Sequence, residues 1–262
     1  MRIGILGVGH LGAYLLRGLI DAGTAPGDLL LSPRGAEAAR RLSDSHGIAV
    51  AASNAALVEA ADLVVLAVRP ADAVAAVDGL PWTSRHLLVS ACAGVRLDAL
   101  RPPAAPAEVV RAMPISAVSI GRSPTTVYPD HPAAREVFSR VGEVLVLPDE
   151  EAFSVASVSA ALYGWVHELI GRSVAWSAAQ GLPEPLARRL QAQTFAAAAG
   201  MVLDAPDLPV DELVRRLATP GGITEAGLDS LRRDGVGEAW TDAQDAAFAR
   251  LRALGGPPDT PR

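Results

Sequence analysis

The sequence contains no lysine and a single cysteine, Cys92, and aromatic residues make up only 4% of its 262 positions. The absence of lysine excludes enzymes that depend on a catalytic lysine side chain. A lone cysteine excludes an intramolecular disulfide and a cysteine-rich zinc site, and it agrees with a reducing, cytoplasmic location. Because aromatic residues are so few, Ala, Leu and Val must build the core, which favours closely packed helices.

A strong positive charge and a long apolar run are also missing. The net charge of −6 argues against a dedicated nucleic-acid surface. The longest uncharged apolar stretch, 152–166, contains three serines and is shorter than the roughly 18–20 residues that a membrane span needs. Met1-Arg2 leads directly into the apolar run 3–6, so we expect no signal peptide. The sequence therefore predicts neither nucleic acid nor a membrane as a partner.

The pattern of apolar residues differs between the two halves of the chain. Up to about Pro148, short Val, Leu and Ile runs alternate with Ala-rich amphipathic stretches, which predicts a parallel sheet covered by helices on both faces. After Pro148 the strand signals disappear, and the rest reads as all-helical to about Leu254. We expect strands at 3–6, 29–31, 63–67, 87–89, 109–111 and 144–147, and helices at 10–21, 36–46, 71–77, 150–180, 183–203, 210–217, 223–233 and 237–254.

The helical half is rich in apolar residues and would expose much of them on its own, so we expect it to form a homodimer or a higher homo-oligomer. The predicted domains are 1–148 and 149–254, followed by a proline-containing tail, 255–262, that is predicted to be disordered.

A glycine-rich loop, Gly7-Val8-Gly9-His10-Leu11-Gly12, ends the first predicted strand and opens the first predicted helix. In that context the spacing is typical of dinucleotide binding: Gly7 makes the tight turn, Gly9 lets the backbone approach a pyrophosphate, and Gly12 allows close packing of helix on strand. The phosphates would lie on the free N–H groups of the helix that starts near His10. The alternative is a purely structural turn. The loop predicts an α/β N-terminal Rossmann domain, followed by an all-α C-terminal dimerisation domain.

The end of the second predicted strand reads Leu31-Ser32-Pro33-Arg34 and carries no acid. NAD-specific sites place Asp or Glu there to bind the ribose 2′-hydroxyl, whereas Ser32 and Arg34 suit a 2′-phosphate. The sequence therefore predicts NADPH in preference to NADH, unless Arg34 is an ordinary solvated residue.

Several motifs follow the glycine loop in a fixed order, and together they resemble the pyrroline-5-carboxylate reductase family from Met1 to about Leu254. The most specific are a Leu-Ala-Val-basic-Pro element and a Thr-Pro-Gly-Gly-x-Thr element. The matching motifs are Gly7–Gly12, Asn54, Asp62–Pro70, Ser90–Val95, Arg111-Ala112-Met113-Pro114 and Thr219-Pro220-Gly221-Gly222-Ile223-Thr224.

The resemblance implies an NAD(P)H-dependent reduction of a cyclic imine, pyrroline-5-carboxylate or a related imino acid, to a proline-like amine. It also implies a helical domain that intertwines with its partner in a dimer. Asn54 would contact the adenosine ribose, Ala67, Val68, Arg69 and Pro70 would line the adenosine side, and Cys92, Ala93, Met113 and Pro114 would flank the nicotinamide. We assign no chemistry to Cys92, and packing is an equally good interpretation of Met113.

The Thr219–Thr224 segment also has a physical interpretation of its own. Gly221 and Gly222 leave backbone N–H groups free at the start of the next helix, which suits a substrate carboxylate. By resemblance Thr224 is the catalytic residue that hydrogen-bonds the imine nitrogen, and Thr219, Gly221, Gly222 and Ile223 would bind the substrate. The alternative is a helix-capping turn with Thr219 as the N-cap.

One segment departs from the family. Where relatives carry a Ser-Gly-Ser-Gly-Pro-Ala-Tyr stretch, this chain reads Ser159-Ala160-Ala161-Leu162-Tyr163-Gly164-Trp165, and the Asn expected after Met-Pro is Ile115. We expect a reshaped, more apolar pocket, with Ser159 and Tyr163 at the substrate. Tyr163 and His167 are four residues apart and share a helix face. They are either a new acid or hydrogen-bonding group beside the imine or, the interpretation we favour, packing or dimer contacts.

Two other functions compete with imine reduction. A catalytically impaired paralogue that binds the cofactor as a regulatory protein would explain the altered 159–165 segment. The intact Thr219–Thr224 segment argues against that interpretation. A hydroxyacid-type dehydrogenase of similar layout needs a catalytic lysine and is excluded, because the chain has none.

Overall fold

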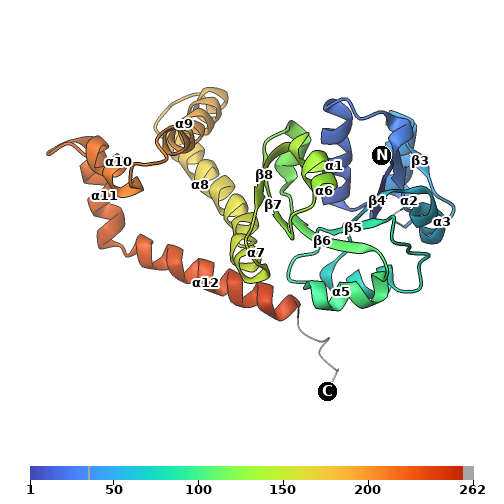
Figure 1. The fold of residues 1–262 in the computed structure, drawn as a ribbon. Coiled ribbons are helices and arrows are strands. Elements are labelled where there is room, and N and C mark those ends of the chain that lie inside the picture. Colours follow the sequence, from blue (N-terminus) through green and yellow to red (C-terminus); the bar gives the residue numbers. More distant parts are fainter. Residues whose placement is uncertain (35, 256–262) are drawn as a thin grey trace, which may run out of the picture. The chain divides into compact units, whose positions relative to one another are not determined.

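The structure is a computed structural model that describes residues 1–34 and 36–255 (Figure 1). Its contacts define two compact units. Among the described residues, the first holds 1–160 and 248–255, and the second holds Ala161–Ala247. This division falls later in the chain than residue 148, where the sequence predicts the domain boundary. The domain boundary at residue 148 stays a prediction. Apart from Gly255, the tail predicted to be disordered lies outside the described residues.

The first unit is built on one sheet with the strand order β3-β2-β1-β4-β5-β6-β7-β8, and Figure 1 labels most of its strands and helices. The strands are β1 (Ile3–Leu6), β2 (Leu29–Leu31), β3 (Ala49–Val50), β4 (Leu63–Leu66), β5 (Leu87–Ser90), β6 (Glu108–Met113), β7 (Ser123–Tyr128) and β8 (Gly142–Val146). The helices are α1 (His10–Asp21), α2 (Ala36–His46), α3 (Asn54–Ala60), α4 (Ala73–Val77), α5 (Leu97–Ala104), α6 (Pro132–Ser139) and α7 (Glu150–Ala156), with short 3₁₀ helices at Pro26–Asp28, Pro70–Asp72 and Ser116–Ile120.

Helices cover both faces of the sheet, as the alternating pattern predicts. On one face Leu15, Leu16 and Leu19 of α1 are fully buried in one apolar cluster, and on the other Leu57 and Val58 of α3 are buried in a second. The α/β fold with a Rossmann arrangement, β3-β2-β1-β4-β5-β6, is confirmed.

The expectation of a wholly parallel sheet is wrong at β7, which pairs antiparallel with β6. Only the short 3₁₀ helix Ser116–Ile120 lies between these two strands, too little chain for the crossover that a parallel neighbour requires. The sequence did not indicate β7 because its buried positions include Ser123, Thr125 and Thr126 rather than an apolar run. The two-residue strand β3 was also missed, since both its residues are exposed at the edge of the sheet.

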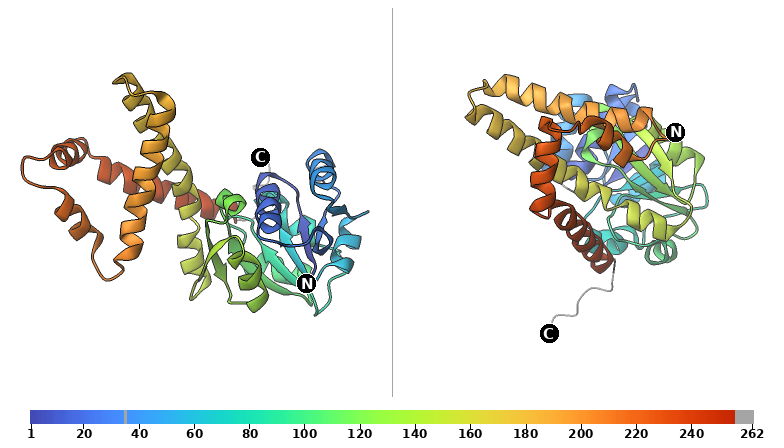
Figure 2. Two further views of the ribbon diagram at one scale, coloured as in Figure 1. Left: turned by 90° about the horizontal axis from the view of Figure 1, so that it is seen from above. Right: turned by 90° about the vertical axis from the view of Figure 1, so that its left-hand side faces the viewer.

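The remaining helices are α8 (Ser159–Ala179), α9 (Glu184–Asp204), α10 (Val210–Leu217), α11 (Ile223–Arg233) and α12 (Val236–Leu254). Figure 2 shows α8 and α9 as a helical hairpin, and near its turn the Gln191 side chain donates to Ser177 Oγ at 3.0 Å. The predicted all-helical second half is confirmed. None of the described helices has the length and apolar character needed to cross a membrane.

The single helix predicted for 150–180 is wrong, because α7 ends at Ala156 and α8 starts at Ser159. The Ser154 and Ser157 hydroxyls donate to the carbonyls of Glu150 and Phe153, each four residues earlier, at 2.9 and 2.8 Å. Serines bonded in this way bend helices. The Val158 amide then turns to the carbonyl three residues back, so the helix breaks where the sequence showed only apolar and small residues.

Candidate dinucleotide and substrate sites

The glycine loop has the geometry that its spacing predicts. Gly7 has φ +100°, and a Cβ there would lie 2.6 Å from Val68 Cγ1. A Cβ on Gly12 would lie 2.8 Å from the Gly7 carbonyl oxygen, so this glycine is needed for the close turn of β1 into α1. Gly9, by contrast, has no atom within 4 Å of the position that a Cβ would take, and the space in front of it is open.

The N-terminus of α1 is left free. Its N-cap residue Gly9 makes no side-chain cap, and the first turn contains no acid. The unsatisfied N–H groups and the positive end of the helix dipole therefore favour an anion in the open space beside Gly9. This helix end fits a dinucleotide pyrophosphate.

Ser32 and Arg34 differ in burial and in their bonding partners. Ser32 is fully buried, and its Oγ accepts a hydrogen bond from the Gly7 amide at 3.1 Å, so it supports the glycine loop from β2. Arg34 is exposed and forms no ion pair with a carboxylate of the described residues. Of the two, Arg34 has its charge free for a 2′-phosphate.

Asn54 opens α3, whose N-cap Ser53 accepts the Ala56 amide at 3.1 Å. The Asn54 side-chain oxygen is buried and has no hydrogen-bond partner among the described residues. A buried acceptor without a partner is costly, and a ribose hydroxyl would supply the missing donor. The residues present therefore fit a bound dinucleotide.

The segments after β4, β5 and β6 carry the other predicted cofactor residues. Arg69 is exposed and pairs with Asp72 at 2.9 Å, and Met113 is buried at the end of β6. Cys92 is 2% exposed, and its thiol donates to the Val68 carbonyl at 3.4 Å. Burial raises the pKa of the Cys92 thiol to about 11, and its hydrogen bonds with Ser90 and with the Val68 carbonyl oppose that rise. The thiol is therefore protonated at neutral pH and serves packing, in agreement with the decision to give it no chemistry.

The predicted substrate segment lies in the second unit, at the start of α11. Gly221 has φ +74°, and Gly222, not Thr219, is the N-cap, so the alternative with Thr219 in that role is wrong. The Thr219 carbonyl instead accepts the Gly222 amide at 2.8 Å and closes the turn. Thr224 is exposed, and Ile223 is 94% exposed.

One contact at this turn was not foreseen. The Glu225 carboxylate accepts the Gly221 amide at 2.7 Å, so one of the N–H groups expected to meet a substrate is already occupied by an anion. The amides of Ile223 and Thr224 have no hydrogen-bond partner within the described chain. The only sequence signal for this contact was an acid in the first turn of the helix, which generally favours capping.

Tyr163 and His167 lie on one face of α8, as their spacing predicts. Their rings meet edge to face, with centroids 4.5 Å apart and an interplanar angle of 81°. His167 Nδ1 lies 2.7 Å from the Tyr163 carbonyl oxygen and donates to it, because a carbonyl only accepts. Ser159 is exposed at the start of α8. This pairing agrees with a packing role for His167.

The predicted cofactor residues thus surround the carboxyl ends of β1, β2, β4, β5 and β6 in the first unit, while the Thr219–Thr224 turn belongs to the second. A Rossmann sheet with an uncapped glycine loop, joined to an all-helical unit, defines the class of dinucleotide-dependent oxidoreductases.

Comparison with known proteins identifies the family. Residues 2–94 match the model described as "NADP oxidoreductase coenzyme F420-dependent", and residues 150–254 match the one described as "Pyrroline-5-carboxylate reductase dimerisation". The pyrroline-5-carboxylate reductase of Mycobacterium leprae is 32% identical over 97% of this chain and 96% of its own, and that of Methanosarcina acetivorans is 30% identical over 97% and 98%. The chain belongs to the pyrroline-5-carboxylate reductase family.

Its fold is that of solved members. A Plasmodium falciparum pyrroline carboxylate reductase, whose structure is described with NADP bound, superposes with a TM-score of 0.87 over 98% of both chains at 23% identity. The resemblance inferred from the motifs is confirmed over nearly the whole chain.

Proposed function

We propose that the protein catalyses the NADPH-dependent reduction of a cyclic imine, pyrroline-5-carboxylate or a related imino acid, to a proline-like amine. The observation that carries this proposal is the match, from end to end of both chains, with reductases named for pyrroline-5-carboxylate. A match confined to the Rossmann half would support dinucleotide binding alone, because that fold serves many reactions.

The cofactor would lie along the first unit. The open N-terminus of α1 supports pyrophosphate binding, and the unpartnered oxygen of Asn54 supports a contact with the adenosine ribose. The unpaired charge of Arg34, with no acid at the end of β2, supports NADPH in preference to NADH. When bound, the cofactor supplies the hydride, and the protein holds the reacting groups in place.

On the substrate side, the free amides of Ile223 and Thr224 would bind the carboxylate of the imino acid. The Thr224 hydroxyl would hydrogen-bond the imine nitrogen, which makes the imine carbon a better hydride acceptor. Glu225 occupies the Gly221 amide, so that amide is not counted in the anion site. Because Leu162 and Tyr163 replace small residues of the family, we propose that the pocket is reshaped and that a related imino acid is a better substrate than pyrroline-5-carboxylate itself.

We further propose that the active form is a homodimer, or a larger homo-oligomer, that works in the cytoplasm. Large apolar side chains are exposed on α9, among them Leu186, Leu190, Met201 and Leu203, and an apolar surface of this kind favours association. Sedimentation at micromolar protein should give the mass of at least two chains, and a monomer under these conditions would contradict the proposal.

Three imines would identify the reaction. Oxidation of NADPH, followed at 340 nm, should occur with pyrroline-5-carboxylate, pyrroline-2-carboxylate or the six-membered analogue of the latter, and the best substrate should show the highest kcat/KM. Turnover of pyrroline-5-carboxylate above the others would show that the altered 159–165 segment is tolerated. NADPH binding without turnover of any imine would overturn the proposal and support the regulatory paralogue instead.

A further inference from the structure

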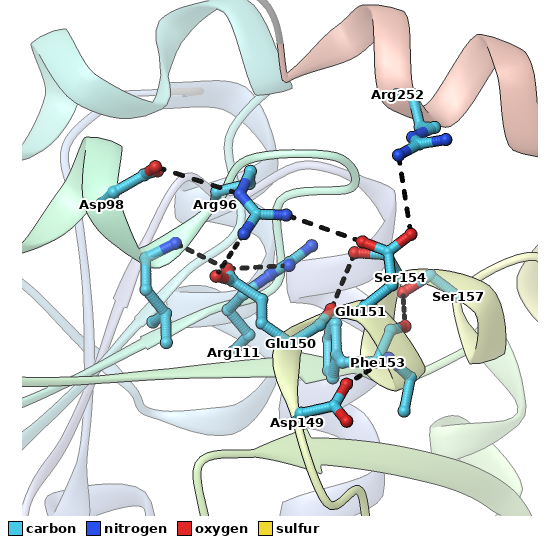
Figure 3. Close-up of polar contacts among 12 residues, drawn as sticks. Arg96, Asp98, Arg111, Asp149, Glu150, Glu151, Phe153, Ser154, Ser157 and Arg252 are labelled. Atoms are coloured by element: carbon cyan, nitrogen blue, oxygen red, sulfur yellow. Dashed lines mark hydrogen bonds and ion pairs between the residues drawn. The ribbon is translucent and has the colours of Figure 1, made fainter.

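The Glu150 carboxylate joins three donors from two distant segments (Figure 3). Oε1 accepts the Leu97 amide at 2.8 Å and the Arg111 guanidinium at 3.0 Å. Oε2 lies 3.1 Å from the Arg96 guanidinium. Glu150 is the first residue of α7, so a single carboxylate at a helix start bridges the segment after β5 and strand β6.

This ion pair is largely withdrawn from water. The Arg111 side chain is 1% exposed and that of Glu150 is 15% exposed, and the guanidinium lies 4.3 Å from the centre of the Phe153 ring. Burial lowers the pKa of the Arg111 guanidinium, and the charge and hydrogen bond of Glu150 act against that change. Buried pairs add little net stability over apolar packing, but they hold a defined geometry because their donors and acceptors must stay matched.

The two bridged segments are the ones proposed to flank the nicotinamide. Leu97 ends the stretch that begins with Cys92-Ala93, and Arg111 stands two residues before Met113 in β6. The strands that lead into both are direct neighbours, with Ser90 opposite Arg111. Glu150 therefore ties the segment that follows β5 to Arg111, which stands in the last residue pair between β5 and β6.

The end of α12 restricts the movement of the 92–97 segment from another side. Gly94 has φ +79°, and a Cβ on it would lie 2.5 Å from the Leu251 carbonyl oxygen. The segment is thus in backbone contact with α12 and bound to α7 through Leu97, which leaves it few ways to move without breaking the Glu150 contacts.

We infer that Glu150 is a positioning residue: it fixes the 92–97 segment against the end of β6 and thereby sets the geometry in which hydride is transferred. This inference rests on the proposed function for its catalytic consequence. The positioning itself is testable without substrate or cofactor.

The first measurement is hydrogen exchange of the full-length protein without ligands. Glu150→Gln keeps the shape of the side chain and removes the charge that holds the three donors. Amides in 92–97 should exchange at least about tenfold faster than in the wild type, while β1 and β4 stay unchanged. Glu143→Gln, at an exposed position of β8, is the matched control and should leave the 92–97 amides as they are. Equal exchange in all three proteins would overturn the inference.

The second measurement separates positioning from binding. With the best imine substrate, Glu150→Gln should lower kcat by about tenfold or more, because small misplacements of reacting groups slow transfer strongly. The Kd for NADPH should stay within about twofold, and the kinetic isotope effect with 4-deuterated NADPH should increase. If kcat at saturating NADPH is unchanged and only the Kd for NADPH rises, the inference is overturned.

A double variant guards against misfolding. In Arg111→Met/Glu150→Gln no unpaired charge is left in the interior, so the fold should be retained while the 92–97 amides stay fast-exchanging and kcat stays low. Recovery of wild-type kcat would show that Glu150 only neutralises Arg111, which contradicts positioning. If the wild type reduces no imine, the proposed function fails, and hydrogen exchange alone decides the role of Glu150.

Discussion

At the scale of single residues, two polar side chains at the end of β2 have different structural roles. Ser32 turns inward and supports the Gly7 amide, while Arg34 stays exposed and unpaired within the described chain. A serine two residues before an arginine resembles a two-residue phosphate site in sequence, yet Ser32 is buried and does not reach the surface. The proposed selectivity for a 2′-phosphate then rests mainly on Arg34.

Replacing Arg34 by Ala should raise KM for NADPH by about tenfold or more, since a charge-assisted hydrogen bond contributes roughly 1.5–3 kcal/mol. KM for NADH should change little, because NADH has no 2′-phosphate. Arg41→Ala, an exposed arginine of α2 that pairs with Glu37 at 3.6 Å, is the control. Steady-state kinetics with both cofactors would reject the assignment if the two KM values rose equally.

A second prediction concerns Thr224 at the start of α11. Thr224→Ala removes the hydroxyl proposed to bond the imine nitrogen, so kcat/KM for the imine should fall about tenfold or more, as expected for a lost hydrogen bond in the transition state. NADPH affinity, measured by fluorescence, should be unchanged. Thr241→Ala on α12, whose exposed hydroxyl donates to the Gly237 carbonyl, is the matched control. Unchanged imine turnover in Thr224→Ala would show that the proposed role is wrong.

At the scale of elements, α1 must lie very close to the 3₁₀ helix Ser116–Ile120. Gly18 sits inside α1, where glycine is normally unfavourable, and a Cβ there would lie 2.0 Å from the Val118 carbonyl oxygen. The backbone contact explains the glycine, and it brings the connection between β6 and β7 onto the helix whose N-terminus is proposed to bind phosphate.

Gly18→Ala tests that packing. Alanine would gain about 1 kcal/mol of helix propensity, but a clash with backbone that cannot rotate away costs about 1–3 kcal/mol or more, so we expect net destabilisation. Gly227→Ala in α11, where a Cβ would meet nothing within 4 Å, should instead stabilise by about 0.5–1 kcal/mol. Urea unfolding measures both; a Gly18→Ala variant as stable as the wild type would contradict the close approach.

At the scale of the whole molecule, pH should act on stability through His86. This side chain is 2% exposed, and its Nδ1 accepts the Thr83 amide at 2.9 Å, which requires the neutral ring. Burial lowers the pKa of His86, the neighbouring Arg85 lowers it further, and Asp62 opposes the change. Because the folded-state pKa lies below that of the unfolded chain, the contribution is complete above about pH 6.5 and is lost as the pH falls through the folded-state value.

His86→Asn keeps an acceptor for the Thr83 amide and removes the titration. The wild type should therefore lose more free energy of unfolding between pH 8 and pH 5.5 than this variant, as measured by urea denaturation at each pH. Other titrating groups are shared and cancel in the difference. Parallel pH profiles for the two proteins would show that His86 is not the group responsible.

The sequence by itself determined the features that depend on local order. The apolar runs of β1, β2 and β4, the glycine spacing of the loop and the bounds of α10 and α11 follow from residues that are neighbours in the chain. The motifs of the family could be recognised for the same reason, since each is a short run at a fixed spacing.

Only the tertiary structure decided the features that join distant segments. Ser123 and Thr125 satisfy each other at 3.0 Å inside β7, so a strand with buried polar residues is stable where its composition predicts none. Ser32 meets Gly7 across 25 residues, and Arg111 meets Glu150 across 39. Periodicity predicts which face of an element is buried. It does not predict which polar group a buried side chain will contact, because the contact depends on how the elements pack.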